Sequence, residues 1–153
     1  MYQFKDHHLY IPAIALITLL ISSLLSAQGM IWYHTLALPW YTPPAWAFPI
    51  VWNIIYFLTI ISAIMFWDVA KNDKEVKILF AMNTFLNVLW TYLFFYMHML
   101  GASLAIAVLL ECTIVLMMLL MWPTSWRAAL LLLPYLLWVG FAIVLNYGVW
   151  TLN

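Results

Sequence analysis

The 153-residue chain is 69% hydrophobic and only 7% charged, and its formal net charge is zero. A water-soluble domain of this length needs a far more charged surface, so the composition indicates an integral membrane protein. The composition argues against nucleic-acid binding, because the chain has 5 Lys and Arg residues and no basic tract. The single cysteine, Cys112, provides neither a disulfide framework nor a Cys/His metal site, so we expect no metal centre.

Several apolar runs have the length of about 20 residues that a helix needs to cross a bilayer. They do not show the alternating polarity of an outer-membrane β-strand. The sequence therefore predicts an all-α integral membrane protein, a bundle of five transmembrane helices that forms one domain, residues 1–153. The expected spans are residues 9–27, 45–67, 78–97, 101–121 and 128–150, and a loop at 28–44 joins the first two.

The basic residues indicate how the chain is oriented in the membrane. All of them fall in the N-terminal tail, the loop between the second and third spans, or the loop between the fourth and fifth. Because successive spans cross the membrane in opposite directions, these three segments lie on the same side. The positive-inside rule makes that side cytoplasmic, so we expect a cytoplasmic N-terminus. This asymmetry favours a bacterial inner membrane, with an outer membrane as the alternative. The basic residues are Lys5, Lys71, Lys74, Lys77 and Arg127.

The stretch WYTPPAWAFPIVW, residues 40–52, leads from the first loop into the second span. Its prolines fix backbone angles and withhold amide donors, so the loop is stiff and cannot be helical throughout. Non-helical backbone at membrane depth persists only where protein covers it or where it lines a cavity. We therefore interpret the loop as a lid over the open end of the bundle. Most tryptophans lie near span ends, as in an interfacial belt, but Trp52, Trp90 and Trp138 lie deeper.

Three stretches resemble, in order and spacing, the TspO/translocator protein family, the tryptophan-rich sensory proteins related to the peripheral-type benzodiazepine receptor. They are WYHTLALPWYTPPAWAFPIVWNIIY at 32–56, NTFLNVLWTYLFF at 83–95 and PYLLWVGFAIVLNYGVW at 134–150. The chain departs from the family pattern in its lid, where Leu38 replaces a usual Lys and Tyr41 a usual Trp. It also has no basic residue after Tyr147, so a sterol-recognition pattern found in some members is broken.

The resemblance implies a compact five-helix bundle, commonly a homodimer, with a ligand cavity that the loop between the first two helices closes. It implies binding of porphyrins such as protoporphyrin or heme, of other tetrapyrroles, of sterol-like lipids and of benzodiazepine-type drugs, with no cofactor required. By position in the motifs, the ligand-binding residues would be Tyr33, Pro43, Trp52, Asn83, Asn87, Trp90, Trp138, Phe141, Ala142 and Leu145.

Helical spacing supports the same pocket. Asn83, Asn87, Trp90 and Phe94 fall at i, i+4, i+7 and i+11, which places them on one face of the third span. Amides facing lipid would be unfavourable, so this face should point into the bundle, either lining a cavity or bonding neighbouring helices. A matching face on the fifth span carries Trp138, Phe141, Ala142, Leu145 and Val149.

Three functions remain open at this point. The first is a membrane receptor, sensor or carrier that binds tetrapyrroles or similar apolar molecules. The second is light-driven or oxidative breakdown of bound porphyrin, with Trp52 and Trp138 as redox partners, because the sequence shows no nucleophile–base set that would supply catalytic residues. The third is proton or ion conduction through Glu111, the one carboxylate deep in a span.

Overall fold

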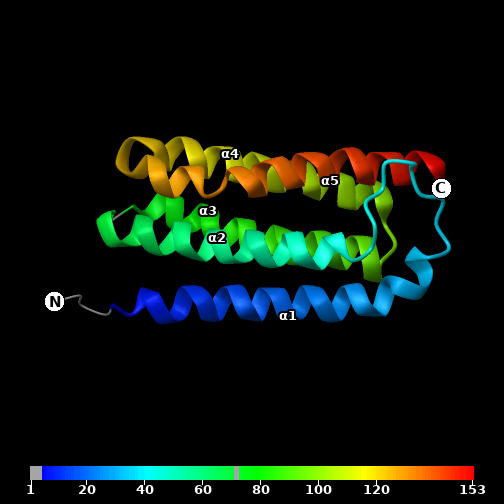
Figure 1. Ribbon diagram of the computed structural model, residues 1–153, viewed down its shortest axis with the longest axis horizontal. Coiled ribbons are helices and arrows are strands. Elements are labelled where there is room, and N and C mark those ends of the chain that lie inside the picture. The colour runs from blue at the N-terminus through cyan, green and yellow to red at the C-terminus, as the bar shows by residue number, and fades with distance from the viewer. Residues whose placement is uncertain (1–4, 71–72) are drawn as a thin grey trace.

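The computed structural model describes residues 5–70 and 73–153, so Lys71, one of the basic residues, lies outside the described residues. The described chain forms an antiparallel bundle of long helices (Figure 1). Five segments are long and apolar enough to cross a membrane, which confirms the predicted fold class. The elements are α1 (His7–Tyr33), α2 (Ala47–Val69), α3 (Lys74–Thr91), the π-helical turn η1 (Tyr92–Tyr96), α4 (Leu100–Leu130) and α5 (Leu133–Leu152).

Helix α1 is the outermost and least buried element of the bundle (Figure 1). It packs against α2, α3 and η1, and of its 27 residues Thr18 and Gly29 are the buried ones. The tightly packed core lies instead among α2, α3, α4 and α5, where Phe66, Val76 and Ile114 are fully buried. Open space inside the bundle therefore lies along α1.

The helix boundaries follow local sequence signals. Asp73 caps α3 by accepting a hydrogen bond from the Val76 amide at 3.1 Å, as expected of an aspartate at this position. A proline lies in the first turn of α5, where its missing amide donor is least unfavourable. The predicted break between the fourth and fifth spans is a kink at Ser125 (φ −152°), after which α4 continues to Leu130.

The first loop is shorter than predicted, because α1 continues through residues 28–33 and ends at Tyr33. We therefore define the lid loop as residues 34–46. Gly29, within the segment predicted as loop, lies in helix and allows η1 to approach α1 closely. A Cβ at Gly29 would overlap the carbonyl oxygen and Cβ of Phe95. Gly29 is thus a close packing contact between α1 and η1.

Candidate ligand-binding chamber

A cavity of about 550 Å³ lies beneath the lid loop, enclosed by α1, α2, α3, η1 and α5; we call it the lid chamber. Its volume is typical of small-molecule sites in proteins. The predicted site residues that line it are Tyr33, Pro43, Trp52, Asn87, Trp90, Phe94, Trp138, Ala142 and Leu145.

Two of the predicted residues lie outside this wall. Phe141 packs against the Trp138 ring, with centroids 5.7 Å apart, and does not line the lid chamber. Asn83 lies one helical turn below Asn87, where it lines a second cavity. The third-span stripe does face the bundle interior as predicted, because Asn83 and Asn87 are only 5% and 6% exposed.

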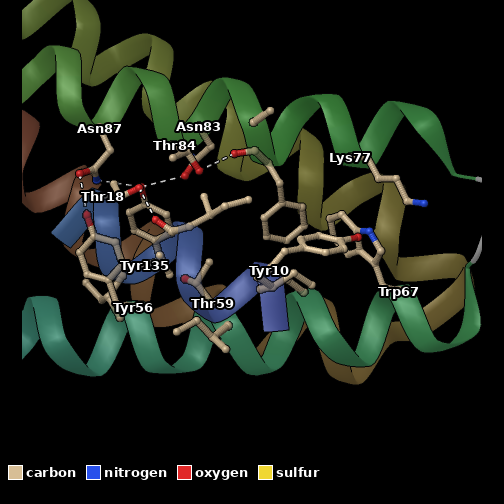
Figure 2. A pocket seen from close by; sticks show the side chains of 18 of the residues that line it. Tyr10, Thr18, Tyr56, Thr59, Trp67, Lys77, Asn83, Thr84, Asn87 and Tyr135 are labelled. Atoms are coloured by element: carbon tan, nitrogen blue, oxygen red, sulfur yellow. Dashed lines mark hydrogen bonds between the residues drawn. The ribbon is translucent and has the colours of Figure 1, made fainter. Parts of the chain in front are cut away.

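A chain of hydrogen bonds separates the two cavities (Figure 2). The Tyr56 hydroxyl donates to Asn87 Oδ1 at 3.0 Å, and Asn87 Nδ2 donates to the Tyr135 hydroxyl at 3.2 Å. The Tyr135 hydroxyl in turn donates to Asn83 Oδ1 at 3.0 Å, and Asn83 Nδ2 donates to Thr113 Oγ1 at 2.8 Å. The two amides therefore join α2, α3, α4 and α5 and form a polar floor to the lid chamber.

Aromatic rings form the walls above this floor. The Trp90 and Phe94 rings stack with centroids 5.4 Å apart, and Trp32 contacts Phe94 edge-on at 5.8 Å. Across the chamber, Phe48 of α2 meets the Trp138 ring edge-on at 5.7 Å. Phe94 belongs to the π-helical turn η1, and such turns are frequent at functional sites because they shift side chains out of α-helical register.

Two polar side-chain atoms of residues in the wall, Ser22 Oγ and Trp90 Nε1, are buried without a hydrogen-bond partner in the described residues. The indole Nε1 of Trp90 can act only as a donor. A buried donor left without a partner is unfavourable by about 1–3 kcal/mol, so such groups are rare in native structures. Trp90 therefore carries a buried donor that no group of the described chain satisfies, on a ring that lines the lid chamber.

The lid loop is fastened to the end of α5. The Asn153 side chain makes two hydrogen bonds to the backbone of Ala37, one to its carbonyl and one from its amide, each 3.0 Å long. The Tyr41 hydroxyl donates to the Val144 carbonyl at 3.4 Å. Trp40 is 95% exposed and takes no part in this attachment. Tyr41, which replaces a family tryptophan, thus makes one of the lid's contacts with α5.

Several residues of the site were not predicted from the sequence. Tyr56 lines both cavities, and its position one turn after Trp52 on the same face of α2 is a signal that could have identified it. Ser22 and Ser26 of α1 also line the lid chamber. Glu111 lines neither cavity; its Oε1 lies 3.4 Å from a Cβ built at Gly140 of α5.

Known proteins are similar in sequence to this chain over most of its length. The model of the TspO/MBR family matches residues 10–151, nearly the whole chain. Protein CrtK from Rhodobacter capsulatus is 36% identical over 126 residues, which cover 80% of this chain and 78% of that protein.

Relatives come from other domains of life as well. The tryptophan-rich protein TspO from Archaeoglobus fulgidus is 37% identical over 133 residues, 86% of each chain. The translocator protein from Sus scrofa is 32% identical over 130 residues, which cover 82% of this chain and 77% of that protein. With a family match over nearly its whole length and relatives above 30% identity, this chain is an integral membrane protein of the TspO/MBR family.

Proposed function

We propose that the protein is a receptor, sensor or carrier that binds porphyrins and other flat apolar molecules in the lid chamber. The observation that carries this proposal is the buried, unpartnered Trp90 Nε1 in the wall of an aromatic cavity. An apolar cavity with a few fixed polar groups is the usual composition of a small-molecule site. Sterol-like lipids and benzodiazepine-type drugs share the same chemistry, a rigid apolar body with few hydrogen-bonding groups.

The walls suit a flat macrocycle. Trp90 and Phe94 on one side and Trp138 on the other offer ring faces and edges, worth about 0.5–1.5 kcal/mol per aromatic contact beyond area burial. Neither Lys, Arg, Asp nor Glu from the described part of the chain lines the lid chamber. The carboxylates of a porphyrin would therefore point toward the lid loop and water, while a neutral acceptor would face Trp90 Nε1.

Porphyrin binding by Trp90→Phe tests this proposal. The substitution keeps an aromatic ring and removes the donor, so we expect protoporphyrin affinity to fall about 2- to 10-fold, the loss of one hydrogen bond. Trp40→Phe is the matched control, because Trp40 is 95% exposed outside the chamber. Equal affinity of the two variants and the unsubstituted protein would overturn the role of Trp90, and no saturable binding at all would overturn the proposal.

Light-driven breakdown of bound porphyrin, with dioxygen as the oxidant, is the second candidate. It is favoured by the presence of Trp52, Trp90 and Trp138 in one chamber, where an excited porphyrin could oxidise an indole in contact with it and the reduced porphyrin could then react with dioxygen. Illumination of the protein–protoporphyrin complex should then yield a product spectrum that is lost in the Trp52→Ala, Trp138→Ala double variant. Bleaching equal to that of free porphyrin would dispose of this activity.

We also propose an orientation and an assembly. Lys5, Lys74, Lys77 and Arg127 belong to the end of the bundle that carries the N-terminus (Figure 1), which supports a cytoplasmic N-terminus in a bacterial inner membrane. A cysteine-labelling experiment on Lys74→Cys in intact cells tests this, since labelling by an impermeant reagent would contradict it. The family resemblance supports a homodimer, which chemical cross-linking in nanodiscs would detect as a band of twice the monomer mass.

A further inference from the structure

The second cavity is a separate chamber of about 430 Å³, and the porphyrin proposal does not use it. It lies between α1, α2 and α3 in the half of the bundle nearer the N-terminus, below the hydrogen-bonded floor (Figure 2). Trp52, Tyr56 and Asn87 line both cavities and form the partition between them. We call this cavity the second chamber.

The lining of the second chamber is mostly apolar along its length and charged at one end. Between the floor and the far end its wall is made mostly of aliphatic and aromatic side chains such as Ile55, Ile60 and Phe80, together with Thr18, Thr59 and Thr84. Figure 2 shows Lys77 at the end opposite the floor, beside Trp67. The Lys77 ammonium lies 5.7 Å from the centroid of the Trp67 ring, within cation–π range.

Lys77 is the one charged residue among the described residues that line the second chamber. An occupant of this chamber therefore meets a long apolar wall and a single positive charge at the outer end. That distribution is complementary to a molecule with an apolar chain and one anionic head.

We infer that the second chamber is a binding site for an anionic amphiphile, an apolar chain that ends in one carboxylate. The chain would lie between α1 and α2 beside Thr59, and the carboxylate would contact Lys77 at the membrane surface. Helix α1 contributes few buried residues, so a chain could enter past it from the bilayer. This site is independent of porphyrin binding in the lid chamber.

Photolabelling in nanodiscs tests the inference. The probe is hexadecanoic acid that carries a diazirine near the end of its chain, compared with the corresponding uncharged alcohol. Mass spectrometry at residue resolution should place the label from the acid on residues of α1 and α2 that line the chamber, such as Thr18, Ile55 and Thr59. The alcohol should label these residues less, because it lacks the charge that Lys77 recognises.

Three variants decide the role of the charge. Lys77→Gln should lower labelling by the acid about tenfold at a fixed probe concentration, and Lys77→Arg should retain it. Lys74→Gln is the matched control, because Lys74 is exposed on the same helix and does not line the chamber. Protoporphyrin binding by each variant reports on folding and on the lid chamber separately.

Two results would overturn the inference. The first is equal labelling by the acid and the alcohol, or by Lys77→Gln and the unsubstituted protein, which would mean that the charge is not recognised. The second is label confined to outward-facing residues such as Ile17 and Phe57, which are 57% and 63% exposed, as expected of bulk lipid contact. If the unsubstituted protein is labelled by the acid as expected but does not bind protoporphyrin, the proposed function is refuted and this site remains supported.

Discussion

Tyr41 of the lid loop lies directly against Gly148 of α5. A Cβ at Gly148 would overlap the Tyr41 hydroxyl and come within 2.7 Å of Pro39 Cγ. Glycine at this position is therefore what lets the lid loop reach α5, where Tyr41 bonds the Val144 carbonyl. The lid of this protein is closed by contacts between a loop tyrosine and a helix glycine.

We expect Gly148→Ala to open the lid loop. The added methyl group must displace Tyr41 and Pro39, and overpacking of this kind is unfavourable by about 1–3 kcal/mol. Stopped-flow measurement should show protoporphyrin leaving the variant at least about five times faster. Gly140→Ala is the control, because a Cβ there meets only Glu111 Oε1, at an ordinary contact distance of 3.4 Å. Equal release rates in both variants would contradict this account of the lid.

Asn153→Ala should loosen the same lid from its other attachment. The substitution removes both side-chain hydrogen bonds to Ala37, each worth about 0.5–1.5 kcal/mol. Hydrogen exchange of the Ala37 amide should therefore become about tenfold faster or more. Thr151→Val serves as the control, since the Thr151 hydroxyl bonds the Gly148 carbonyl within α5 and does not contact the lid. Unchanged exchange at Ala37 would show that other contacts hold the loop.

The polar floor should contribute measurably to stability. Tyr135→Phe removes the acceptor for Asn87 Nδ2 and the donor to Asn83 Oδ1, and it leaves two buried amides less satisfied. Single interhelical hydrogen bonds in membranes contribute about 0.6 kcal/mol on average to stability. We therefore expect the loss of both bonds, with two buried amides left less satisfied, to lower the free energy of unfolding by about 1–3 kcal/mol. Thermal unfolding in detergent should show a lower Tm for Tyr135→Phe than for Tyr147→Phe, because Tyr147 is 54% exposed. Equal Tm values would mean that the floor does not stabilise the bundle.

Asp68 should anchor the start of α1. Its carboxylate accepts a hydrogen bond from Lys5 Nζ at 2.6 Å and lies 3.1 Å and 3.4 Å from the Nε2 atoms of His7 and His8. Because the ion pair is partly exposed, Asp68→Asn should lower stability by only about 1 kcal/mol or less. Hydrogen exchange in the first turns of α1 should accelerate, and high salt should produce part of the same change in the unsubstituted protein. A variant with unchanged exchange there would contradict the anchor.

The five membrane-spanning helices could be predicted, because the hydropathy and the length of each apolar run indicate a span. The interior face of α3 followed from the spacing of Asn83, Asn87 and Trp90, since buried amides in a membrane must face protein. Helix α1 extends beyond the predicted span 9–27 to Tyr33, and Gly29 lies within it. The role of Gly29 is a close contact with Phe95, which depends on a helix distant in sequence.

The site could be predicted in part for a similar reason. Spacing along one helix identifies which residues share a face, but it does not show how deep a cavity extends. Asn83 therefore falls in a second chamber, because the Tyr56–Asn87 hydrogen bond joins two helices and divides the interior. Phe141 shares the face of Trp138, yet it packs on that ring instead of lining the chamber.

Porphyrin affinity of Trp52→Ala and Trp138→Ala tests the central claim most directly. Both rings line the lid chamber, so each truncation should weaken protoporphyrin binding about tenfold, as loss of an aromatic contact and buried area predicts. Trp122→Ala, which removes a 51% exposed ring outside the chamber, should bind as the unsubstituted protein does. Affinity unchanged in both Trp52→Ala and Trp138→Ala would show that the lid chamber is not the porphyrin site.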